Sequence, residues 1–465
     1  MIAVAKIQHV HIVGVGGAGT SGLARLLQAR GVKVTGSELM EGESLASLRA
    51  EGMRVWGNHR AANVSPQVDL VVHSAAVPRE NHELAEARRR GIPICKYAEF
   101  LGRLLGDEYG IAVAGTHGKT TTAGMLASIF LAAGRNPSVL IGGIHPDLGG
   151  NCRHGPDPEF IVEACEYDRS FLALKPHAGI ITNLELDHPE IYPSENELLR
   201  AFQSFVARFQ PGGLLLVHGD STLLRRVAPP LGVRRVTFGL GPHCQWRARV
   251  HSCGAQPSFQ VWHEGREWGR IDLTVPGPTS VHNALAACAL AAELGLPPRS
   301  IAMGLASFPG IERRFQRRGS VAGVELVDDY AHHPTEVAGA ITTAREVFPG
   351  RRLWAVFQPH QFGRLQAYGP GFAEALQKAD QIALLPVYSV REDPSAFPLG
   401  LLDQFAQRLA ARVPMHRLSS LEAAQRQLLE RLTRGDVCLC LGAGDVYKLT
   451  AALGKSLGRP REKPA

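Results

Sequence analysis

Cysteine spacing gives no sign of a disulfide framework in this 465-residue chain. The eight cysteines are scattered, and no pair follows the C-x-x-C spacing of zinc or redox motifs. Dense, regular cysteine patterns belong to small secreted scaffolds, so their absence excludes that class. We expect free thiols and a protein that works in a reducing compartment.

Long hydrophobic runs are also missing. The most apolar long stretch, 284–296, is interrupted by Glu293 and Gly295, and it is shorter than the roughly 18 to 20 apolar residues that span a bilayer. The amino-terminal residues lack a basic region followed by an apolar signal segment. These absences predict a cytoplasmic location without membrane insertion.

No block of a single charge stands out either. Lys and Arg total 50 against 43 Asp and Glu, and the formal net charge of +7 is spread along the chain. The lack of a basic block argues against nucleic acid as a partner. The small positive excess fits a polyanionic small substrate better.

The length and the pattern of elements predict a multidomain α/β protein. At about 150 residues per domain, the chain has room for about three domains. Short apolar strands alternate with helical stretches, which predicts parallel sheets covered on both faces. We expect strands at 10–15, 32–36, 111–114, 160–163, 179–182, 324–327, 353–357, 382–385 and 437–441, and helices at 19–30 and 122–133.

Domain limits follow from where new units begin. A fresh strand and glycine loop start near residue 110, and a third unit begins after the segment 308–315. We therefore expect domains at 1–107, 108–311 and 312–465. The turn-rich segment 239–278, with its three tryptophans, predicts a small antiparallel insertion in the central domain.

The first glycine loop has the spacing of a dinucleotide fingerprint. Gly14, Gly16 and Gly19, with Gly17 between them, follow an apolar strand in the pattern G-x-G-x-x-G, and Glu38 ends the next strand. Glycines let the backbone approach a diphosphate, whose charge is favoured at a helix N-terminus. The loop predicts a Rossmann-like amino-terminal domain that binds a diphosphate, either NAD or another one.

The second glycine loop is the stronger signal. It lies between a buried strand and a helix, and Val113 stands where the full G-x-x-x-x-G-K-T pattern has its first glycine. Such a loop offers backbone amides to phosphate oxygens, a lysine to the β and γ phosphates and a hydroxyl to Mg²⁺. We expect ATP and Mg²⁺ in a P-loop-type central domain, bound by Gly115, Thr116, His117, Gly118, Lys119, Thr120 and Thr121.

Further magnesium ligands are expected at the ends of the next strands. Glu163 ends one predicted strand, and Asp187 and His188 follow another. Ligands bind outside the carboxyl ends of parallel strands, so these positions converge on the lysine loop. Glu166 and Asp168, taken singly, are as well explained as helix caps or surface ion pairs.

Several motifs together resemble the Mur ligases, ATP-dependent amide-forming enzymes that build the peptide stem of peptidoglycan. They occur in the family's order and cover nearly the whole chain: GTHGKTT at 115–121, TNLELDH at 182–188, VHN at 281–283, RRF at 313–315 and VDDYAHHPT at 327–335. The resemblance implies a Rossmann-like carboxy-terminal domain as well. FQPH at 357–360 and GAGD at 442–445 are similar to the members that join L-alanine to UDP-N-acetylmuramate.

The resemblance also implies a role for each matching position. The amino-terminal domain would bind the UDP-sugar through Gly14, Gly16, Gly17 and Gly19, with His188 of the central domain completing the set. The central domain would bind ATP through the lysine loop, His282 and Asn283, with Thr120, Glu163 and His188 at the metal. The carboxy-terminal domain would bring Arg314 and Asp329 to ATP and bind the amino acid through Tyr330, His332, His360 and Arg364. His282 is equally well explained as a helix-start residue with a structural hydrogen bond.

The implied chemistry explains these residue types. The lactyl carboxylate would attack the γ-phosphate of ATP, and the resulting acyl phosphate would react with the amine of alanine. Lys119, Arg314 and Mg²⁺ would spread the charge of the phosphoryl transfer. His332 is a candidate base for the amine, and these three residues form the expected catalytic set of Lys119, Arg314 and His332.

Three positions depart from the family pattern. Cys165 stands where an aspartate is usual, Gln361 where a basic residue is usual, and Ala286 where an asparagine is expected. The resemblance implies that Arg364 carries more of the contact with the alanine carboxylate as a result. Of the residues between Lys175 and Lys378 none is a lysine, so the chain lacks the carbamoylated lysine that bridges metals in some relatives.

Alternative functions remain open at this point. An NAD-dependent oxidoreductase would explain the first glycine loop and Glu38 but not the Lys119 loop. A ligase of the same family that attaches a whole tripeptide would share nearly all of the motifs. A non-catalytic nucleotide-dependent scaffold is disfavoured because Lys119, Glu163 and His188 are all present. The oligomeric state that we expect is a monomer or a weak homodimer.

Overall fold

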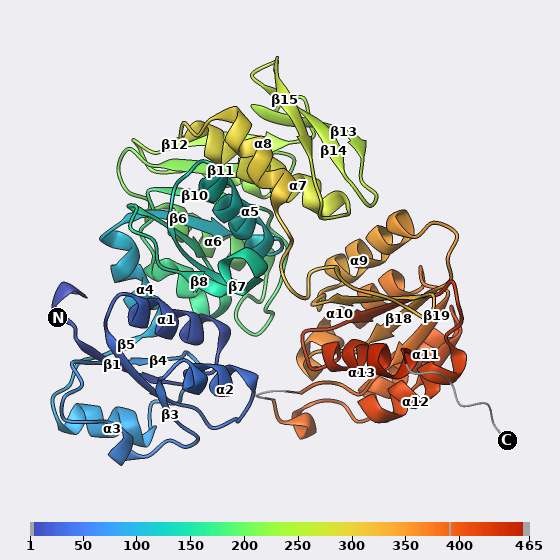
Figure 1. The fold of residues 1–465 in the computed structure, drawn as a ribbon, viewed down its shortest axis with the longest axis horizontal. Helices are drawn as coiled ribbons and strands as arrows, with labels where there is room; N and C mark the ends of the chain where they lie inside the picture. Colours follow the sequence, from blue (N-terminus) through green and yellow to red (C-terminus); the bar gives the residue numbers. More distant parts are fainter. Residues whose placement is uncertain (1–3, 390–391, 459–465) are drawn as a thin grey trace.

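The structure is a computed structural model that describes residues 4–389 and 392–458. It has three lobes, each built around one sheet, as Figure 1 shows from blue through green to red. The sheets hold strands from 9–96, 109–272 and 316–441. This arrangement confirms the α/β fold class with a Rossmann-like, a P-loop-type and a second Rossmann-like part.

The amino-terminal sheet is entirely parallel, in the order β3-β2-β1-β4-β5. After β1 the chain adds β2 and β3 on one side of it, and then adds β4 and β5 on its other side. A sheet whose strand order reverses in this way has a crevice at the carboxyl ends of its strands. The strands are β1 (His9–Val13), β2 (Lys33–Ser37), β3 (Arg54–Trp56), β4 (Leu70–His73) and β5 (Ile94–Lys96), and the helices are η1 (Val4–Lys6), α1 (Ala18–Ala29), α2 (Glu43–Ala50), η2 (Ala61–Asn63), α3 (His82–Arg89) and α4 (Tyr97–Gly106).

The central sheet has ten strands in the order β15-β14-β13-β12-β11-β10-β6-β9-β7-β8. Its strands are β6 (Tyr109–Ala114), β7 (Ser138–His145), β8 (Gly150–Arg153), β9 (Glu159–Glu163), β10 (Ala178–Ile181), β11 (Leu214–His218), β12 (Arg234–Gly239), β13 (Trp246–Ser252), β14 (Ser258–His263) and β15 (Arg266–Asp272). Its helices are α5 (Lys119–Ala132), η3 (Pro146–Leu148), η4 (Tyr167–Ala173), α6 (Glu195–Val206), η5 (Leu224–Arg226), α7 (Pro278–Glu293) and α8 (Pro298–Ser307). β13, β14 and β15 pair antiparallel and form the expected insertion.

The carboxy-terminal sheet has the order β16-β17-β21-β18-β19-β20, and only β16 runs antiparallel to its neighbour. Its strands are β16 (Gln316–Val321), β17 (Val324–Asp329), β18 (Leu353–Phe357), β19 (Gln381–Leu384), β20 (Met415–Arg417) and β21 (Val437–Leu441). Its helices are α9 (Pro334–Val347), α10 (Phe362–Leu376), η6 (Pro394–Ala396), α11 (Leu401–Ala410), α12 (Leu421–Arg431) and α13 (Tyr447–Leu457).

The predicted elements agree closely with the observed ones. The strands expected at 353–357 and 437–441 have the observed limits of β18 and β21, because each is a short run buried on both faces. The helix expected from residue 122 begins at Lys119 instead, since Gly118 turns the chain with a left-handed conformation directly before it. The limits expected at 107 and 311 fall between sheets, and the domain ranges stay predictions.

The two joints between domains differ in character. The amino-terminal and central domains share one hydrophobic cluster, in which Leu23 and Leu26 of α1 join Leu140 of β7 and Phe160 of β9. Asn151 adds a hydrogen bond of 2.7 Å from Nδ2 to the carbonyl of Ala18 across the same joint. Among the described residues, no hydrophobic cluster joins the carboxy-terminal domain to the other two.

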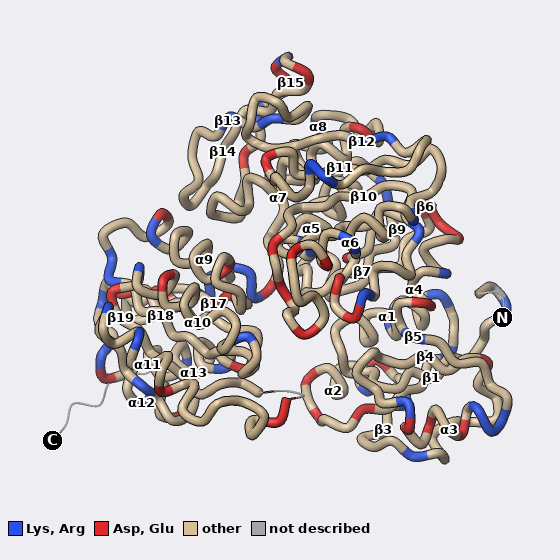
Figure 2. Tube along the Cα trace, turned by 180° about the vertical axis from the view of Figure 1, so that it is seen from behind, with Lys and Arg blue, Asp and Glu red and all other residues tan. Residues whose placement is uncertain are grey.

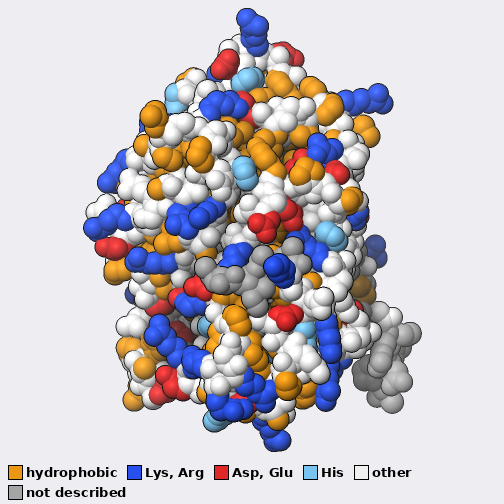
Figure 3. All heavy atoms as spheres, turned by 90° about the vertical axis from the view of Figure 1, so that its left-hand side faces the viewer, with side chains coloured by type: hydrophobic (Ala, Val, Ile, Leu, Met, Phe, Trp, Pro, Cys, Tyr) orange, Lys and Arg blue, Asp and Glu red, His pale blue; other side chains and the backbone are white. Residues whose placement is uncertain are grey.

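Charged residues are interspersed over all three domains, as Figure 2 shows. On the face drawn in Figure 3, Lys and Arg side chains lie scattered among acidic, hydrophobic and neutral ones. Within the described part of the chain, no helix combines the length and the apolar character that a membrane span needs.

The packing of α8 against the helix of the lysine loop makes a stability prediction. A Cβ at Gly304 of α8 would lie 2.5 Å from Cα of Ile129 in α5. We expect Gly304→Val to destabilise the central domain by about 1–3 kcal/mol, because overpacking at a backbone contact forces the helices apart. The midpoint of unfolding in urea measures the effect.

The matched control is Gly106→Ala at the end of α4, where a Cβ would meet nothing within 4 Å. It should leave the midpoint unchanged or raise it slightly. Equal midpoints for the Gly304 variant and the wild type would contradict the tight contact of α8 with α5.

Candidate active site

The lysine loop needs glycine at two positions. Gly115 and Gly118 have φ values of 126° and 81°, a region that side chains with a Cβ rarely adopt. A Cβ at Gly115 would also collide with Thr182, and one at Gly118 with Asn283. Thr182 Oγ1 donates to the carbonyl of His117 at 2.6 Å, so the end of β10 fixes the loop.

Lys119 is held at the start of α5 by acceptors on three sides. Its Nζ donates to the carbonyls of Gly115 and Thr116 at 2.7 and 2.9 Å and pairs with Glu166 at 3.0 Å. Burial disfavours the ammonium, but the Glu166 carboxylate outweighs burial and raises the pKa of Lys119. The lysine is therefore charged at neutral pH and points into the loop where phosphates would lie.

The expected magnesium ligands fall into two neighbouring groups. Thr120 Oγ1 donates to Glu163 Oε2 at 2.7 Å, and the amide of Gly142 donates to the same oxygen at 2.8 Å. His188 groups instead with Glu166 and Asp187, and one ligand atom from each lies within 4.8 Å of the others. Hydroxyl and carboxylate oxygens are ligands that Mg²⁺ prefers, so the donor set fits this ion.

A cavity of about 500 Å³ lies between the central and carboxy-terminal domains and brings both groups together. Arg314 and His332 reach it from the carboxy-terminal domain. Of the sequence-predicted residues, it is lined by Thr116, Gly118, Lys119, Thr120, Glu163, His188, Arg314, Tyr330 and His332. The three residues expected to be catalytic thus face one space.

A second cavity of about 140 Å³ lies beside the lysine loop, between the starts of α7 and α9. Its lining includes the predicted ATP-binding residues His117, Gly118, Thr120, Thr121, Asn283, Arg314 and Asp329. His282 is not part of this lining. Its Nδ1 lies 3.1 Å from the carbonyl of Pro278, which is the structural hydrogen bond that was the alternative for this residue.

A third cavity of about 290 Å³ lies between the amino-terminal and central domains. Gly17 and Gly19 line it, whereas Gly14 and Gly16 do not. Gly14 turns the chain with a φ of 76°, and the amide of Gly16 donates to Glu38 Oε2 at 3.1 Å. Gly14 and Gly16 therefore shape the loop, and the other two glycines face the space.

The third cavity adjoins the first. Four residues line both: Ala18, Gly142, Glu163 and Cys165. Cys165 is exposed there, so a thiol takes the place of the family's carboxylate at this boundary. A ligand in the amino-terminal cavity would reach the Thr120–Glu163 pair with one end.

Arg314 and Asp329 lie close to each other at the domain joint. Arg314 lies over the ring of Tyr330 at 5.1 Å and has Nη1 3.7 Å from Glu336. Both oxygens of Asp329 accept backbone amides, from Phe315 and Ala331 at 2.7 Å each. Burial raises the pKa of Asp329 to about 6, although Arg314 partly offsets it.

The predicted amino-acid residues form a chain of aromatic rings. The rings of Tyr330 and His332 are 5.3 Å apart, those of His332 and His360 are 6.2 Å apart, and His360 stacks on Tyr388 at 6.0 Å. Burial lowers the pKa of His332 to about 3, so the ring is neutral. Its Nδ1 faces the carbonyl of Tyr330 at 3.0 Å, which assigns the proton to Nδ1 and leaves Nε2 as the acceptor.

Arg364 makes a buried ion pair across the domain joint. Its Nη1 and Nη2 lie 2.7 and 3.2 Å from the two oxygens of Asp187, and the arginine is 4% exposed. Burial opposes the Asp187 charge, but Arg364 outweighs it and lowers the pKa of that carboxyl. In this arrangement the guanidinium binds the Asp187 carboxylate in a bidentate manner, as it would bind the carboxylate of an amino acid. Gln361 directly precedes α10 and has a φ of 69°.

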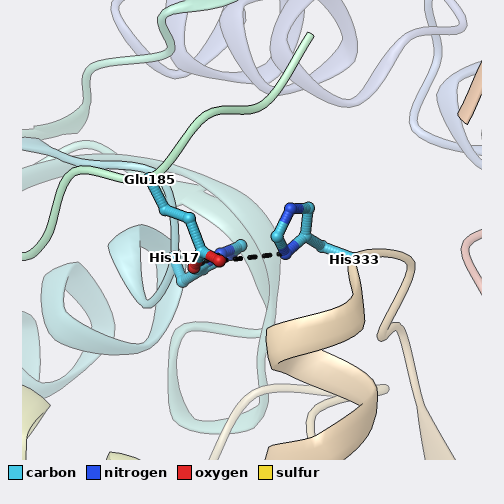
Figure 4. A group of neighbouring side chains, drawn as sticks. All are labelled: His117, Glu185 and His333. Carbon is cyan, nitrogen blue, oxygen red and sulfur yellow. Dashed lines mark hydrogen bonds and ion pairs between the residues drawn. The ribbon is translucent and has the colours of Figure 1, made fainter. Parts of the chain in front are cut away.

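His117 links the lysine loop to the carboxy-terminal domain. Its Nε2 lies 3.1 Å from Glu185 and its Nδ1 lies 3.1 Å from Glu336. Figure 4 shows His117 and Glu185 against each other, with His333 reaching toward them from the start of α9. Burial alone would lower the pKa of His117, but the two carboxylates outweigh it and raise the pKa to about 9.

Sequence reasoning missed two carboxylates of this site. Glu336 directly follows the motif at 327–335, and an acidic residue in the first turn of a helix normally signals only a favourable helix dipole. Glu166 is neither a surface pair nor a side-chain cap, because it is 2% exposed and pairs with Lys119. Asp168, in contrast, does pair with Lys96 at the surface, at 2.9 Å. Ala286 is fully buried in α7 and contributes packing only.

Comparison with known proteins defines the family. Three family models match in order: "Mur ligase family, catalytic domain" at 9–109, "Mur ligase middle domain" at 113–291 and "Mur ligase, glutamate ligase domain" at 313–444. The UDP-N-acetylmuramate--L-alanine ligase of Chlorobium phaeobacteroides is 40% identical over 96% of both chains. That of Rubrobacter xylanophilus is 42% identical over 94% of this chain and 98% of its own.

Solved structures agree with the sequence comparison. The UDP-N-acetylmuramate-alanine ligase MurC of Thermotoga maritima superposes with a TM-score of 0.83 at 29% identity and covers 96% of this chain and 98% of its own. A murein peptide ligase of Psychrobacter arcticus gives a TM-score of 0.73 at 25% identity, covering 98% and 100%. The fold and the lysine loop define a three-domain ATP-dependent ligase. The chain belongs to the Mur ligase family, which confirms the resemblance seen in its motifs.

The position of His117 predicts a pH-dependent joint. With the domains together its pKa is about 9, and an unpaired histidine has a pKa of about 6.5. A raised pKa means that the stabilisation is complete below about pH 6.5 and is lost as the pH rises through about 9. We expect the radius of gyration, measured by small-angle scattering, to increase over that range.

His117→Gln should remove this pH dependence, whereas the exposed histidine variant His251→Gln should retain it. The same transition in the His117 variant and the wild type would assign the change to another group.

Proposed function

We propose that this protein joins L-alanine to the lactyl carboxylate of UDP-N-acetylmuramate at the expense of ATP. Relatives that carry this activity in their names match it at about 40% identity over nearly the whole length of both chains, and this observation carries the proposal. The activity places the protein in the synthesis of peptidoglycan precursors.

Two of the cavities suit the two nucleotide substrates. The UDP-sugar would occupy the cavity next to Gly17 and Gly19, with its carboxylate directed toward the boundary at Glu163. The nucleoside of ATP would lie beside Asn283, with its phosphates at Lys119. Gly14, Gly16 and Glu38 would hold the first loop in shape. We favour a role of His282 in supporting the start of α7 over a direct contact with adenine.

The charges that line the cavity between the central and carboxy-terminal domains suit phosphoryl transfer. The sugar carboxylate attacks the γ-phosphorus, ADP leaves, and the acyl phosphate carries the activated carbonyl. Lys119 and Arg314 are positive groups at opposite sides of the cavity and stabilise charge on the transferring phosphate. We propose that Thr120, Glu163 and His188 hold Mg²⁺, which supplies further charge neutralisation at the phosphates.

The second step is attack of the amine of alanine on the acyl phosphate, with phosphate as the leaving group. The neutral ring of His332 presents Nε2 as an acceptor and fits the task of taking the amine proton. Tyr330 and His360 would pack around the amino acid, and Arg364 would exchange its Asp187 contact for the carboxylate of alanine. Closure of the joint at His117 would exclude water from the acyl phosphate.

A murein peptide ligase is the nearest alternative, because one such structure also covers almost the whole chain. The relatives named for L-alanine favour the amino acid over the peptide. The oxidoreductase reading is disfavoured, since Glu38 already accepts the amide of Gly16. We propose a cytoplasmic protein on the ground that all eight cysteines are free. We propose a monomer or a weak homodimer as the oligomeric state.

Phosphate release by the purified protein tests the function. We expect release only with ATP, Mg²⁺, UDP-N-acetylmuramate and L-alanine together, and mass spectrometry should show a sugar nucleotide heavier by one alanyl unit. Glycine, L-serine and the stem tripeptide serve as parallel amines. A preference for the tripeptide would move the assignment to the peptide ligases, and no release with any amine would overturn the ligase reading.

The role of Lys119 makes a separate prediction. Lys119→Ala should lower the turnover by at least about 1,000-fold, because the variant loses the charge at the transferring phosphate. Binding of UDP-N-acetylmuramate, measured by calorimetry, should change little, since Lys119 does not line the amino-terminal cavity.

The exposed lysine variant Lys175→Ala is the matched control and should keep full turnover. Thermal unfolding of both variants checks that Glu166, left without its partner, does not unfold the domain. Retained turnover in the folded Lys119 variant would contradict the phosphate role.

A further inference from the structure

Three side chains of the kinds that bind metals lie together beyond the carboxyl ends of two strands of the central sheet, away from the three cavities. Asp220 lies two residues after the end of β11, and His243 and Cys244 lie in the loop between β12 and β13. The ends of these parallel strands bring the two segments together, because β11 and β12 pair along their whole length. None of the three residues lines the cavities described above.

The distances within the group suit a single small cation. His243 Nε2 lies 3.4 Å and Cys244 Sγ lies 3.7 Å from Asp220 Oδ1, and all three ligand atoms are within 4.8 Å of one another. Tetrahedral zinc with bonds of about 2.0–2.3 Å places its ligands about 3.3–3.8 Å apart. The group needs only a small contraction to enclose such an ion.

The carboxylate of Asp220 is already oriented. The amides of Leu240 and Gly241 donate to its oxygens at 2.6 and 3.1 Å. Hydrogen bonds of this kind fix the direction of a metal ligand and are a regular part of metal sites. These donors fix the direction of the carboxylate, whose Oδ1 also faces His243 and Cys244. His243 Nε2 lies 3.1 Å from the carbonyl of Gly219 as well, a contact that it would exchange for the ion.

The backbone makes room for the thiol. A Cβ at Gly219 or at Gly239 would lie 2.8 Å from Cys244 Sγ, so only glycine at both positions admits the sulfur. Cys244 is 7% exposed, and its thiol donates to the Asp220 carboxylate at 3.7 Å. The sulfur and the carboxylate oxygen therefore already lie next to each other, as two ligands of one ion do.

The charges of the three ligands suit a divalent cation. Such an ion would bind Cys244 as the thiolate and release the thiol proton to solvent. One thiolate and one carboxylate neutralise the charge of the ion, and the imidazole adds a neutral ligand.

We propose that Asp220, His243 and Cys244 form a zinc site that ties the loop 239–245 to the end of β11. The thiolate favours zinc over magnesium, a hard cation that is not bound by sulfur ligands. His218 has Nε2 3.6 Å from Asp220 Oδ2 and offers a further nitrogen. Its ring contacts that of His282 at 5.5 Å, so the site stiffens the edge of the sheet next to the start of α7.

Cobalt(II) substitution tests the proposal in the full-length protein. Metal-free protein titrated with Co²⁺ should gain the near-ultraviolet absorption of a cobalt–thiolate bond, saturating at one equivalent, and Zn²⁺ should abolish it by competition. Cys244→Ser should lose this absorption, and His243→Gln should weaken binding by more than about 10-fold. His243 is half exposed, so its substitution leaves the core intact if the cysteine variant does not fold.

Cys165→Ser is the matched control, because Cys165 is exposed in the central cavity next to the candidate magnesium ligands. It should retain the cobalt–thiolate absorption. Absence of this absorption in the wild type, its persistence in the Cys244 variant, or its loss in the Cys165 variant alone would each overturn the proposal. None of these outcomes bears on phosphate release, which tests the ligase function separately.

Discussion

The ionic joint between the central and carboxy-terminal domains is the interaction on which the candidate site depends. Asp187 pairs with Arg364, and the charged His117 lies between Glu185 and Glu336. Ionic contacts depend on having both partners in place, because a buried charge without its partner is costly. The amino-terminal joint is instead an apolar cluster that needs no charged partner to hold it together. One joint is therefore fixed, and the other can exchange its contacts for those of charged substrates.

The same side chains hold the joint and face the chemistry. His117 belongs to the loop that positions Lys119, and Glu336 contacts His117, Arg314 and His332. Bringing the carboxy-terminal domain to the central one thus sets the lysine loop, a cation for the phosphate and the candidate base in a single movement. In the proposed reaction this coupling would protect the acyl phosphate, because the groups proposed to make it and to consume it would come together only when the joint forms.

Local patterns of the sequence predict much of this, and long-range charge pairing explains what they leave out. Buried strands such as β18 and β21 are readable from continuous apolar runs, and the carboxyl ends of parallel strands place Glu163 beside Thr120. The partner of Lys119 could not be read, because Glu166 looks like any loop carboxylate until the fold buries it. Glu336 contacts His117 across 219 residues, a distance at which sequence spacing carries no information. The roles of His332, His360 and Arg364 stay predictions for the same reason.

The separate cores of the carboxy-terminal domain have an evolutionary consequence. Its two hydrophobic clusters begin at Phe315 and Val324 and include nothing from the preceding domains. A recombination event at the linker would therefore exchange the whole carboxy-terminal domain while disturbing only polar and ionic contacts at the joint, such as the Asp187–Arg364 pair. New combinations of domains can arise in this way without reopening the apolar interior that the first two domains share.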